Sequence, residues 1–497
     1  MHLPELIVPA PQTMTHRPNE AIMYTGATMG LSACNFTARH PMSQQAEKRR
    51  TVAVVGTGLA GLVTAYLLHH DPRQRYQVKL LEKRNEFSLS SESVTIPTSE
   101  PGKFTVADVP MRAFAGGFYR HLIRMYDYLG VRYHSQQFLF SFTRLSSRGS
   151  PSSDKMSSPL QPHMVHASNF HRLPPVPGKI DLFFWLLEAA YALFFYVWFI
   201  ICASYVAPYE ASSFSSCETF GHYLQRICLP QYYITNYLLP LMSSVCTCSH
   251  QELLNFPASD VLEYKRRTHL QPHYAVDTGV QSVQEKLAKG IDVNFGVCLT
   301  RVVPGSDGVR LEYTDADGNE KSENFDLVVL AISPDIVAAV FEPLKDSLSR
   351  IPTTTVETVA HTDSSSVPPL STNQSGQKIH FRFDKESTEA IHEQPHSSVI
   401  VTTNPITPIK PSHILRSARF TRVLRSPESR RIINDIFRDD KAKDTASFDS
   451  TAPRWRNGDG GVYLAGGWCW DGMVLLEGCV VSAMRVASSL DVEIPWM

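Results

Sequence analysis

A glycine-rich turn near residue 56 constrains this chain more than any other feature. The β-type run Thr51–Val55 leads directly into Gly56-x-Gly58-x-x-Gly61, an apolar helical run follows, and a second β-type run ends in Glu82. In a β-α-β unit the first glycine permits a tight turn, the second lets a pyrophosphate approach the backbone, and the third lets the helix pack closely against the strand. The helix N-terminus then offers N–H groups to the phosphates, and the Glu82 carboxylate can accept hydrogen bonds from a ribose. The sequence therefore predicts a Rossmann-type dinucleotide-binding unit, the alternative being a glycine-rich turn in another kind of β-α-β unit.

Composition restricts the class of protein and its partners. The chain has 497 residues, of which 43% are hydrophobic, so it can build a large core and hold two or three domains. Its formal net charge of −1 gives no electrostatic basis for binding nucleic acid. The nine cysteines are scattered, and Cys246-x-Cys248 has no second pair at zinc spacing, so we expect no metal site and an intracellular, reducing location. Prolines interrupt residues 1–48, which we expect to be a disordered leader rather than a signal peptide.

Hydrophobic periodicity predicts regular elements along the rest of the chain. Phe118, Leu122, Met125 and Leu129 recur at helical spacing, and Gly130 follows as a C-cap. A polar stretch near 146–162 has too few apolar residues to order itself and reads as a surface insertion. The region from about 179 to 270 is mostly helical in pattern. After it come a helix, a strand in "IDVNFGVCLTRVV", a hairpin, the apolar strand "NFDLVVLAISP", and a Ser/Thr/Pro-rich stretch near 352–376.

The C-terminal segment repeats the strand–glycine–helix pattern of the first unit. A strand over 462–465 reaches Gly466-Gly467, and a helix follows that carries Leu476 and Val480 on one face together with Ala483 and Ala487. This order of elements resembles the flavin-containing amine oxidase superfamily, which includes phytoene desaturases and protoporphyrinogen oxidase. The resemblance spans most of residues 50–490, with its strongest motifs at the two ends.

The resemblance implies FAD as cofactor and a discontinuous FAD domain that the last strand and helix complete. The glycine turn would hold the pyrophosphate, Glu82 the adenosine ribose and Val302 the adenine, and a helix starting near Met473 would point its N-terminus at the pyrimidine edge of the flavin. The residues implied to bind the cofactor are Gly56, Gly58, Leu59, Ala60, Gly61, Glu82, Lys83, Val302, Gly466, Gly467 and Val474.

The expected fold is α/β, with a discontinuous Rossmann-type FAD-binding domain and an interleaved α+β substrate domain. The predicted segments are a leader over 1–48, a first FAD-binding segment over 49–145, a surface insertion over 146–178, a helical substrate region over 179–275, a second FAD-binding segment over 276–335, the sheet and loops of the substrate domain over 336–455, and a third FAD-binding segment over 456–497.

A narrower resemblance, carried by "YLLPLMSSVCTCSHQELLNFPASDVLEY", "HTD" and "TNP", points to a branch of predicted FAD-dependent amine-oxidase-like proteins. Bacterial members of that branch accompany lipid-methylating enzymes, which implies lipid-like substrates. Two positions depart from the superfamily pattern. The stretch after Glu82 lacks the usual Gly-Gly, and Gly467-Trp468 stands where an acidic residue often contacts the ribityl chain. Cys469 lies beside the expected flavin, but we interpret it as a buried structural thiol rather than a covalent attachment point.

Residues 182–206 form a long apolar run with Glu188 as its single charge, which meets the length criterion for a transmembrane helix. A single crossing would place the two ends of one FAD domain on opposite sides of the bilayer, and it would expose Glu188 to lipid. We therefore expect one or two helices that dock into one leaflet or line an apolar tunnel. The alternative is a pair of core helices in a soluble domain.

The sequence does not identify a catalytic residue. His361 and Asp363 could form an acid–base pair on one face of a strand, although a structural hydrogen-bonding role explains them better. Trp468 and Trp470 could wall the substrate pocket or pack in the core. We therefore expect an FAD-dependent oxidase or desaturase that takes a hydride from a hydrophobic, lipid-like or amine-bearing molecule. Two alternatives stay open: a flavin-dependent non-redox isomerase, and a non-catalytic dinucleotide-binding protein associated with a membrane.

Overall fold

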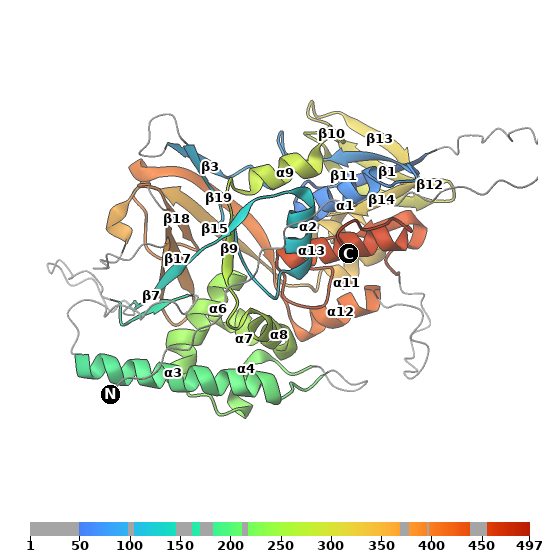
Figure 1. The fold of residues 1–497 in the computed structure, drawn as a ribbon. Helices are drawn as coiled ribbons and strands as arrows, with labels where there is room; N and C mark the ends of the chain where they lie inside the picture. Colours follow the sequence, from blue (N-terminus) through green and yellow to red (C-terminus); the bar gives the residue numbers. More distant parts are fainter. Residues whose placement is uncertain are drawn as a thin grey trace, which may run out of the picture. The chain divides into compact units, whose positions relative to one another are not determined.

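A parallel sheet built from separated stretches of the chain forms one layer of the fold, at the upper right of Figure 1. Every neighbouring pair in it is parallel, so the carboxyl ends of all its strands meet at one edge. In spatial order the strands are β10 (Asp292–Asn294), β2 (Tyr76–Leu81), β1 (Arg50–Val55), β14 (Leu327–Leu330) and β20 (Val462–Leu464). The two ends of the chain thus contribute to the same sheet, as expected for a discontinuous Rossmann-type domain.

The structure is a computed structural model, and it describes residues 49–97, 104–145, 162–168, 182–210, 217–367, 377–394, 397–437 and 455–497. The predicted leader over 1–48 and the polar stretch 146–161 lie outside the described residues. All of the described residues belong to one compact unit.

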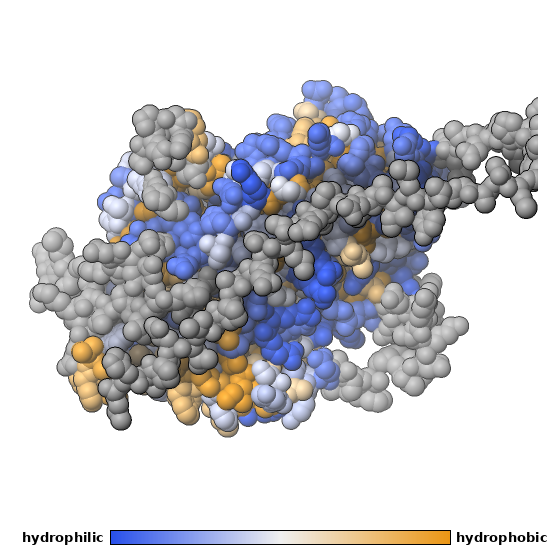
Figure 2. Space-filling model, in the orientation of Figure 1, coloured by the Kyte–Doolittle hydropathy of each residue, from blue (hydrophilic) through white to orange (hydrophobic). Residues whose placement is uncertain are grey.

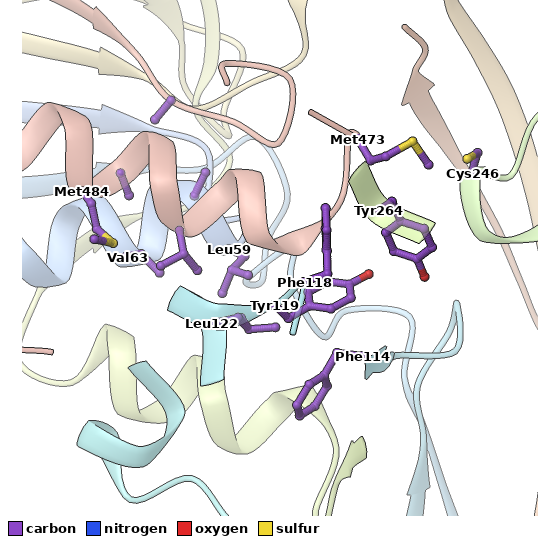
Figure 3. Close-up of a cluster of buried hydrophobic side chains, with 14 of the residues drawn as sticks. Leu59, Val63, Phe114, Phe118, Tyr119, Leu122, Cys246, Tyr264, Met473 and Met484 are labelled. Atoms are coloured by element: carbon purple, nitrogen blue, oxygen red, sulfur yellow. The ribbon is translucent and has the colours of Figure 1, made fainter. Parts of the chain in front are cut away.

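Helices α1 (Leu59–His69) and α13 (Leu476–Ser489) pack against the parallel sheet. Helix α9 (Val280–Ala288) packs in turn against α1, and α2 (Arg120–Leu129) against α13. Helix α1 is apolar and buried on nearly every side because it lies between the sheet, α9 and α13. Figure 3 shows Leu59 and Val63 of α1 between Met484 of α13 and Leu122 of α2. Helix α2 ends at Gly130 in the left-handed conformation (φ 62°), which confirms the predicted cap.

A seven-stranded sheet forms the second layer of the molecule. Its strands are, in spatial order, β19 (Ile414–Val423), β15 (Thr353–His361), β18 (Ile400–Thr403), β17 (Thr388–Glu393), β16 (Gln377–Phe383), β7 (Phe138–Arg144) and β8 (Met164–Ala167). Two of these strands lie where the sequence predicted something else. Strand β7 falls within the predicted first FAD-binding segment, 49–145, yet it pairs with β16. Strand β8 falls within the predicted surface insertion, 146–178, yet it pairs with β7, and its Val165 is fully buried.

The other described elements connect these two sheets. The remaining strands are β3 (Val94–Pro97), β4 (Phe104–Ala107), β5 (Ala113–Ala115), β6 (Tyr133–Ser135), β9 (His273–Val276), β11 (Cys298–Gly305), β12 (Gly308–Thr314) and β13 (Glu320–Phe325). The remaining helices are α3 (Leu182–Tyr205), α4 (Phe220–Arg226), α5 (Gln231–Tyr233), α6 (Leu239–Cys246), α7 (His250–Leu254), α8 (Ala258–Thr268), α10 (Pro334–Val340), α11 (Lys345–Leu348) and α12 (Pro427–Phe437), with a π-helical turn at Ile234–Leu238 and 3₁₀ turns at Glu342–Leu344, Ser364–Ser366, Pro411–His413 and Asp459–Gly461.

Three predicted elements differ in detail from the structure. The run "IDVNFGVCLTRVV" is not one strand: Gly296 turns with φ 70°, and β10 and β11 on either side join different sheets. The Ser/Thr/Pro-rich stretch near 352–376 begins with the nine-residue strand β15, because its threonines and valines suit a pleated, half-buried surface. The helix expected to start near Met473 starts at Leu476.

Candidate active site

A cavity of about 1190 Å³ lies between the parallel sheet and the seven-stranded sheet. On one side it is lined by the loops that follow β1, β14 and β20, including Gly58, Ile332 and Gly467. On the other side it is lined by side chains of β7 and β16, such as Phe140 and Phe381. Ligands of open parallel sheets bind at the carboxyl ends of the strands. The volume exceeds the ~300–1,000 Å³ common for sites that hold one small molecule, so the cavity has room for a cofactor and a substrate together.

The glycine turn has the geometry that a pyrophosphate needs. Gly56 adopts φ 101°, and a Cβ added to Gly61 would lie 1.9 Å from the carbonyl oxygen of Gly56, so both positions require glycine. Gly58 is extended, and a Cβ there would have no atom within 4 Å. Gly58, Leu59 and Ala60 line the cavity, and no described side chain caps the N-terminus of α1. The backbone N–H groups of this first turn are therefore available to an anion in the cavity.

Glu82 stabilises the turn but does not line the cavity. Its Oε2 accepts hydrogen bonds from the N–H (2.9 Å) and the hydroxyl (2.5 Å) of Thr57, and its Oε1 accepts one from the N–H of Arg84 (3.0 Å). With one described donor on Oε1, the carboxylate can still accept a hydrogen bond from a ribose hydroxyl.

Two other residues predicted to bind the cofactor, Lys83 and Val302, do not line the cavity. Lys83 is exposed and does not line the cavity. Val302 is buried in β11 within a core cluster, so its side chain serves packing rather than the cavity. The backbone neighbour of Glu82 is instead Val297, whose N–H donates to the Glu82 carbonyl oxygen (2.9 Å). The roles of Lys83 and Val302 in binding the cofactor stay predictions.

The closing segment, residues 462–479, reaches the same cavity from the other end of the chain. Gly466, Gly467, Trp468 and Val474 all line it. A Cβ on Gly467 would meet the Leu475 carbonyl oxygen at 3.1 Å, so this backbone passes very close to the start of α13. The predicted approach of the glycine turn and the closing segment is therefore present in the fold, although the FAD-binding role of each residue stays a prediction.

The aromatic residues of the closing segment have different places. The Trp468 indole N–H donates to the Ile332 carbonyl oxygen (3.0 Å), which fixes the ring as a wall of the cavity. Trp470 does not line the cavity: its indole N–H donates to the Met473 carbonyl oxygen, and its ring packs edge-on against Phe118. Cys469 is fully buried, and burial raises the pKa of its thiol, as expected for a structural cysteine.

Two arginines that sequence reasoning missed point to an anion in the cavity. Arg112 and Arg422 both line it, and each influences the Cys479 thiol at the start of α13. Burial lowers the pKa of Arg422, and the positive charge of Arg112 lowers it further. Within the described residues Arg422 has no ion-pair partner, while Asp108, which interacts electrostatically with Arg112, accepts hydrogen bonds from other groups. Two neighbouring cations with so little compensation favour a negatively charged ligand.

The possible acid–base pair His361 and Asp363 lies elsewhere. The His361 side chain is fully buried and hydrogen-bonded to the Thr402 hydroxyl (2.8 Å), and its Nδ1 accepts from the backbone N–H of Asp363 (3.2 Å). Asp363 lies beyond the end of β15, where its carboxylate accepts hydrogen bonds from Ser365. Neither residue lines the cavity. The structure therefore favours the structural role for this pair.

These residues fit FAD. The turn at Gly58 offers space and N–H donors for a pyrophosphate, Glu82 retains acceptor capacity for a ribose, and Arg112 and Arg422 supply positive charge between the turn and the closing segment. The first residues of α13 line the same cavity. The site therefore has donors and acceptors matched to the phosphates and polar edges of a dinucleotide.

Comparison with known proteins agrees with this geometry. Residues 54–129 match the family model of an NAD(P)-binding Rossmann-like domain, and residues 228–409 match that of flavin containing amine oxidoreductases. No protein of curated function matches the chain by sequence.

Several solved structures share the fold over most of their length. A candidate protoporphyrinogen oxidase from Exiguobacterium sp. 255-15 is 16% identical, with 90% of this chain and 99% of that chain covered at a TM-score of 0.51. Cyclohexylamine oxidase from Brevibacterium oxydans IH-35A is 13% identical (89% and 100% covered, TM-score 0.53). The conjugated-linoleic-acid (CLA)-producing fatty acid isomerase from P. acnes is 12% identical (90% and 99% covered, TM-score 0.55). With its α/β fold, its discontinuous dinucleotide sheet and both family matches, this chain resembles the flavin-containing amine oxidase superfamily, and its cofactor is FAD.

Proposed function

We propose that this FAD-dependent oxidoreductase takes a hydride from a hydrophobic small molecule held in the cavity. The observation that carries the proposal is the wall facing the closing segment. It consists of apolar side chains from two paired strands, namely Phe138, Phe140, Phe142, Ile379 and Phe381. Such a wall binds apolar surface and excludes water. FAD supplies the hydride acceptor, so the protein has to bind, orient and desolvate the substrate.

The tyrosines of the cavity suit this role. Tyr119 and Tyr264 both line it, and burial raises the pKa of each phenol. Figure 3 labels both rings and Cys246, and the Cys246 thiol interacts electrostatically with each phenol. Neutral phenols present flat apolar faces with one hydrogen-bonding hydroxyl each. They can therefore hold and orient an apolar substrate without adding a charge beside it.

A non-redox isomerase is the second candidate. The observation in its favour is that a protein named as a fatty acid isomerase shares the fold over 90% of this chain. Both candidates need FAD and an apolar cavity, and they differ in whether electrons leave the substrate. An isomerase yields a product of unchanged mass and consumes no oxygen, whereas an oxidase or desaturase product is two hydrogens lighter.

The first test is optical. Purified protein is expected to carry bound flavin that absorbs in the visible range and is identified as FAD by mass after release. Anaerobic addition of an oxidisable apolar compound, drawn from a panel of long-chain amines, fatty acids and polyenes, is expected to bleach that absorbance. Folded protein purified without flavin, and unable to bind added FAD, would contradict the proposal. Conversion of a panel compound to an isomer of equal mass without bleaching would favour the isomerase.

The apolar helix α3 extends the proposal to a membrane as the source of substrate. By length and composition α3 can cross a membrane. One side packs against α8, and much of the remainder is exposed, including Phe184, Leu187, Phe194 and Ile201. Figure 2 shows hydrophobic residues along the edge of the molecule where α3 runs in Figure 1. Its single acid, Glu188, accepts hydrogen bonds from Tyr232 and Tyr237, which lowers the cost of placing it near lipid.

We propose that the exposed apolar side of α3 inserts into one leaflet of a bilayer. A full crossing by α3 would separate β8, which precedes it, from β16, which follows it, although both pair with β7 in one sheet. A helix lying in the membrane surface keeps those strands together and buries its exposed apolar side. The cavity also reaches α3, where Trp185, Leu193 and Tyr196 line it, so an apolar molecule could pass from lipid into the cavity.

Replacing three exposed side chains tests this surface. We expect F184S/L187S/F194S to weaken co-sedimentation with dioleoyl phosphatidylcholine vesicles at least about tenfold, because burying each large apolar side chain contributes roughly 1.5–3 kcal/mol. The matched control is I336S/I414S/L415S, which removes exposed apolar residues elsewhere and is expected to sediment like wild type. Equal sedimentation of the two triple variants would contradict the leaflet. The leaflet would also be contradicted if the wild type forms a dimer that does not sediment with vesicles and the α3 triple variant is a monomer, because the surface would then be a dimer interface.

A further inference from the structure

Lys265 is a cation in the cavity to which the proposed hydride transfer assigns no role. It lies on α8 and lines the cavity together with Thr268 and Gln271. Within the described residues no carboxylate forms an ion pair with it. Glu263, the nearest acid along α8, pairs with Arg267 instead (2.6 Å). Burying an ammonium group without a counter-charge is unfavourable, so a residue of this kind in a cavity calls for a ligand.

The groups around Lys265 come from four stretches of the chain. They are one tyrosine and three histidines that carry no charge at neutral pH, so Lys265 is the positive charge of this group. Its Nζ lies 4.8 Å from the centre of the Tyr196 ring on α3. His166 on β8 and His273 on β9 also line the cavity and interact electrostatically with it, and burial lowers the pKa of each to about 4. Burial together with the lysine charge lowers the pKa of His269, at the end of α8. The histidines are therefore neutral at about pH 7, while Lys265, whose pKa burial lowers to about 8, is mostly charged.

Lys265 is near the region of the cavity that opens beside α3. Leu193 and Leu270 both line the cavity and are 61% and 64% exposed, so the cavity meets the surface there. The charges that act on Arg422 belong to a different group, including Tyr119 and Arg112. The cavity thus has one set of cations beside the closing segment and a separate lysine beside α3.

We propose that Lys265 binds the anionic head group of an amphipathic substrate, whose apolar chain extends along the phenylalanines of β7 and β16. The chemistry is that of a long-chain carboxylic acid or an alkyl phosphate, one negative charge at the end of a hydrocarbon chain. This assignment rests on the proposed function and deepens it, because it names the class of molecule that the apolar wall holds. A molecule of this class dissolves in a leaflet, which suits entry beside α3.

An ion pair between the Lys265 ammonium and an anionic head group is energetically favourable in this cavity. An anion bound by Lys265 would supply the counter-charge that the described residues lack, and a charge-assisted hydrogen bond in a poorly solvated site is stronger than one in water. A neutral ester of the same chain would gain the apolar contacts but leave the ammonium uncompensated. The head group is therefore expected to contribute selectivity for acids over esters.

Binding of a fluorescent probe tests this without requiring turnover. Dansyl-undecanoic acid is titrated into the full chain, and oleate, methyl oleate and oleoyl lysophosphatidic acid are used to displace it. Wild type is expected to prefer oleate over methyl oleate by about tenfold or more, the equivalent of one charge-assisted hydrogen bond. K265M should lose that preference while keeping the affinity for methyl oleate, and K265R should retain it.

The pH dependence separates lysine from arginine. Because an ammonium is charged only below its pKa, the wild-type preference for oleate should fall as the pH rises through the pKa of Lys265, which the bound anion raises above its value in the empty site. K265R should keep the preference through about pH 10, since arginine stays charged there. Stronger displacement by lysophosphatidic acid than by oleate would identify a phosphate head group.

Several outcomes would overturn the inference. Equal affinity of wild type for oleate and methyl oleate, or an unchanged preference in K265M, would show that Lys265 does not bind a head group. If K265M binds methyl oleate poorly, the substitution has damaged the cavity itself. The test then rests on K265R, and loss of the preference for oleate in K265R would contradict the inference. Flavin content is read separately from absorbance, so a failure of the oxidoreductase proposal would not be mistaken for a failure of this one.

Discussion

Gly58→Asp is expected to abolish FAD binding while leaving the protein folded. Gly58 is extended, and an added Cβ meets no atom within 4 Å, so the larger side chain should fit the backbone without strain. Its carboxylate would stand at the N-terminus of α1 and in the cavity, where the pyrophosphate is expected. Two like charges in that position repel, and the acid also competes for the same N–H groups. We expect the affinity for FAD to fall by more than about 100-fold, equivalent to about 2.7 kcal/mol.

The measurement is flavin content after purification, followed by titration of the apoprotein with FAD. Gly58→Ala is the matched control, since it adds a Cβ without a charge and should lose much less affinity. Thermal unfolding has to be compared between apoproteins, because bound FAD stabilises the wild type by mass action. Stoichiometric FAD in Gly58→Asp would mean that the pyrophosphate does not lie at this turn.

Arg422→Met should have opposite effects on stability and on cofactor binding. In the apoprotein Arg422 is a half-buried cation that lines the cavity beside Arg112, with no described ion-pair partner, so an apolar side chain of similar length should leave stability unchanged or raise it by about 1 kcal/mol. With FAD present the same guanidinium can compensate the negative charge of the cofactor. Its removal should weaken FAD binding by about 10- to 100-fold, the contribution of one or two hydrogen bonds to a charged group.

Urea unfolding of the apoprotein and FAD titration give the two quantities. Arg419→Met is the matched control, because Arg419 lies on the same strand but is exposed, and it should change neither. Arg422→Lys should recover some of the affinity through its charge. If Arg422→Met destabilises the apoprotein by several kcal/mol, the guanidinium has a structural partner and the assignment to the cofactor is wrong.

The glycine turn and the closing segment were predictable because their patterns are local. Gly56 and Gly61 are needed for a turn and a close helix contact that almost any side chain would prevent, so the residue types themselves carry the information. The same holds for Gly130, which ends α2 in the left-handed conformation. Periodicity likewise identified α13, although its start came three residues later than predicted.

The cations of the cavity were not predictable from the chain. Arg112, Lys265 and Arg422 are three of 47 basic residues, and no motif distinguishes them. They matter because β19, α8 and the segment before β5 bring them to one cavity, where no described carboxylate forms an ion pair with Lys265 or Arg422. By contrast, Ala331–Ser333 could have been named, since residues that follow a strand of a parallel sheet lie at its ligand-binding edge.

Long-range pairing also decided where β7, β8 and β15 belong. Short strands gain their stability from neighbours distant in the sequence, so their own composition carries a weak signal. The sequence predicted that residues 164–167 belong to a polar surface insertion. Their pairing with β7 shows that they form an edge strand of the seven-stranded sheet.

The amino-acid sequence alone identified a dinucleotide-binding α/β unit, because glycine spacing and apolar periodicity are set within about thirty residues of chain. That the C-terminal segment completes the same domain was implied by the resemblance to the flavin-containing amine oxidase superfamily, and the pairing of β14 with β20 confirms it. Tertiary structure decided which side chains meet in the cavity and that α3 lies beside its opening. Those facts depend on contacts between segments far apart in the sequence, where the identity of a residue says little until its neighbours in space are known.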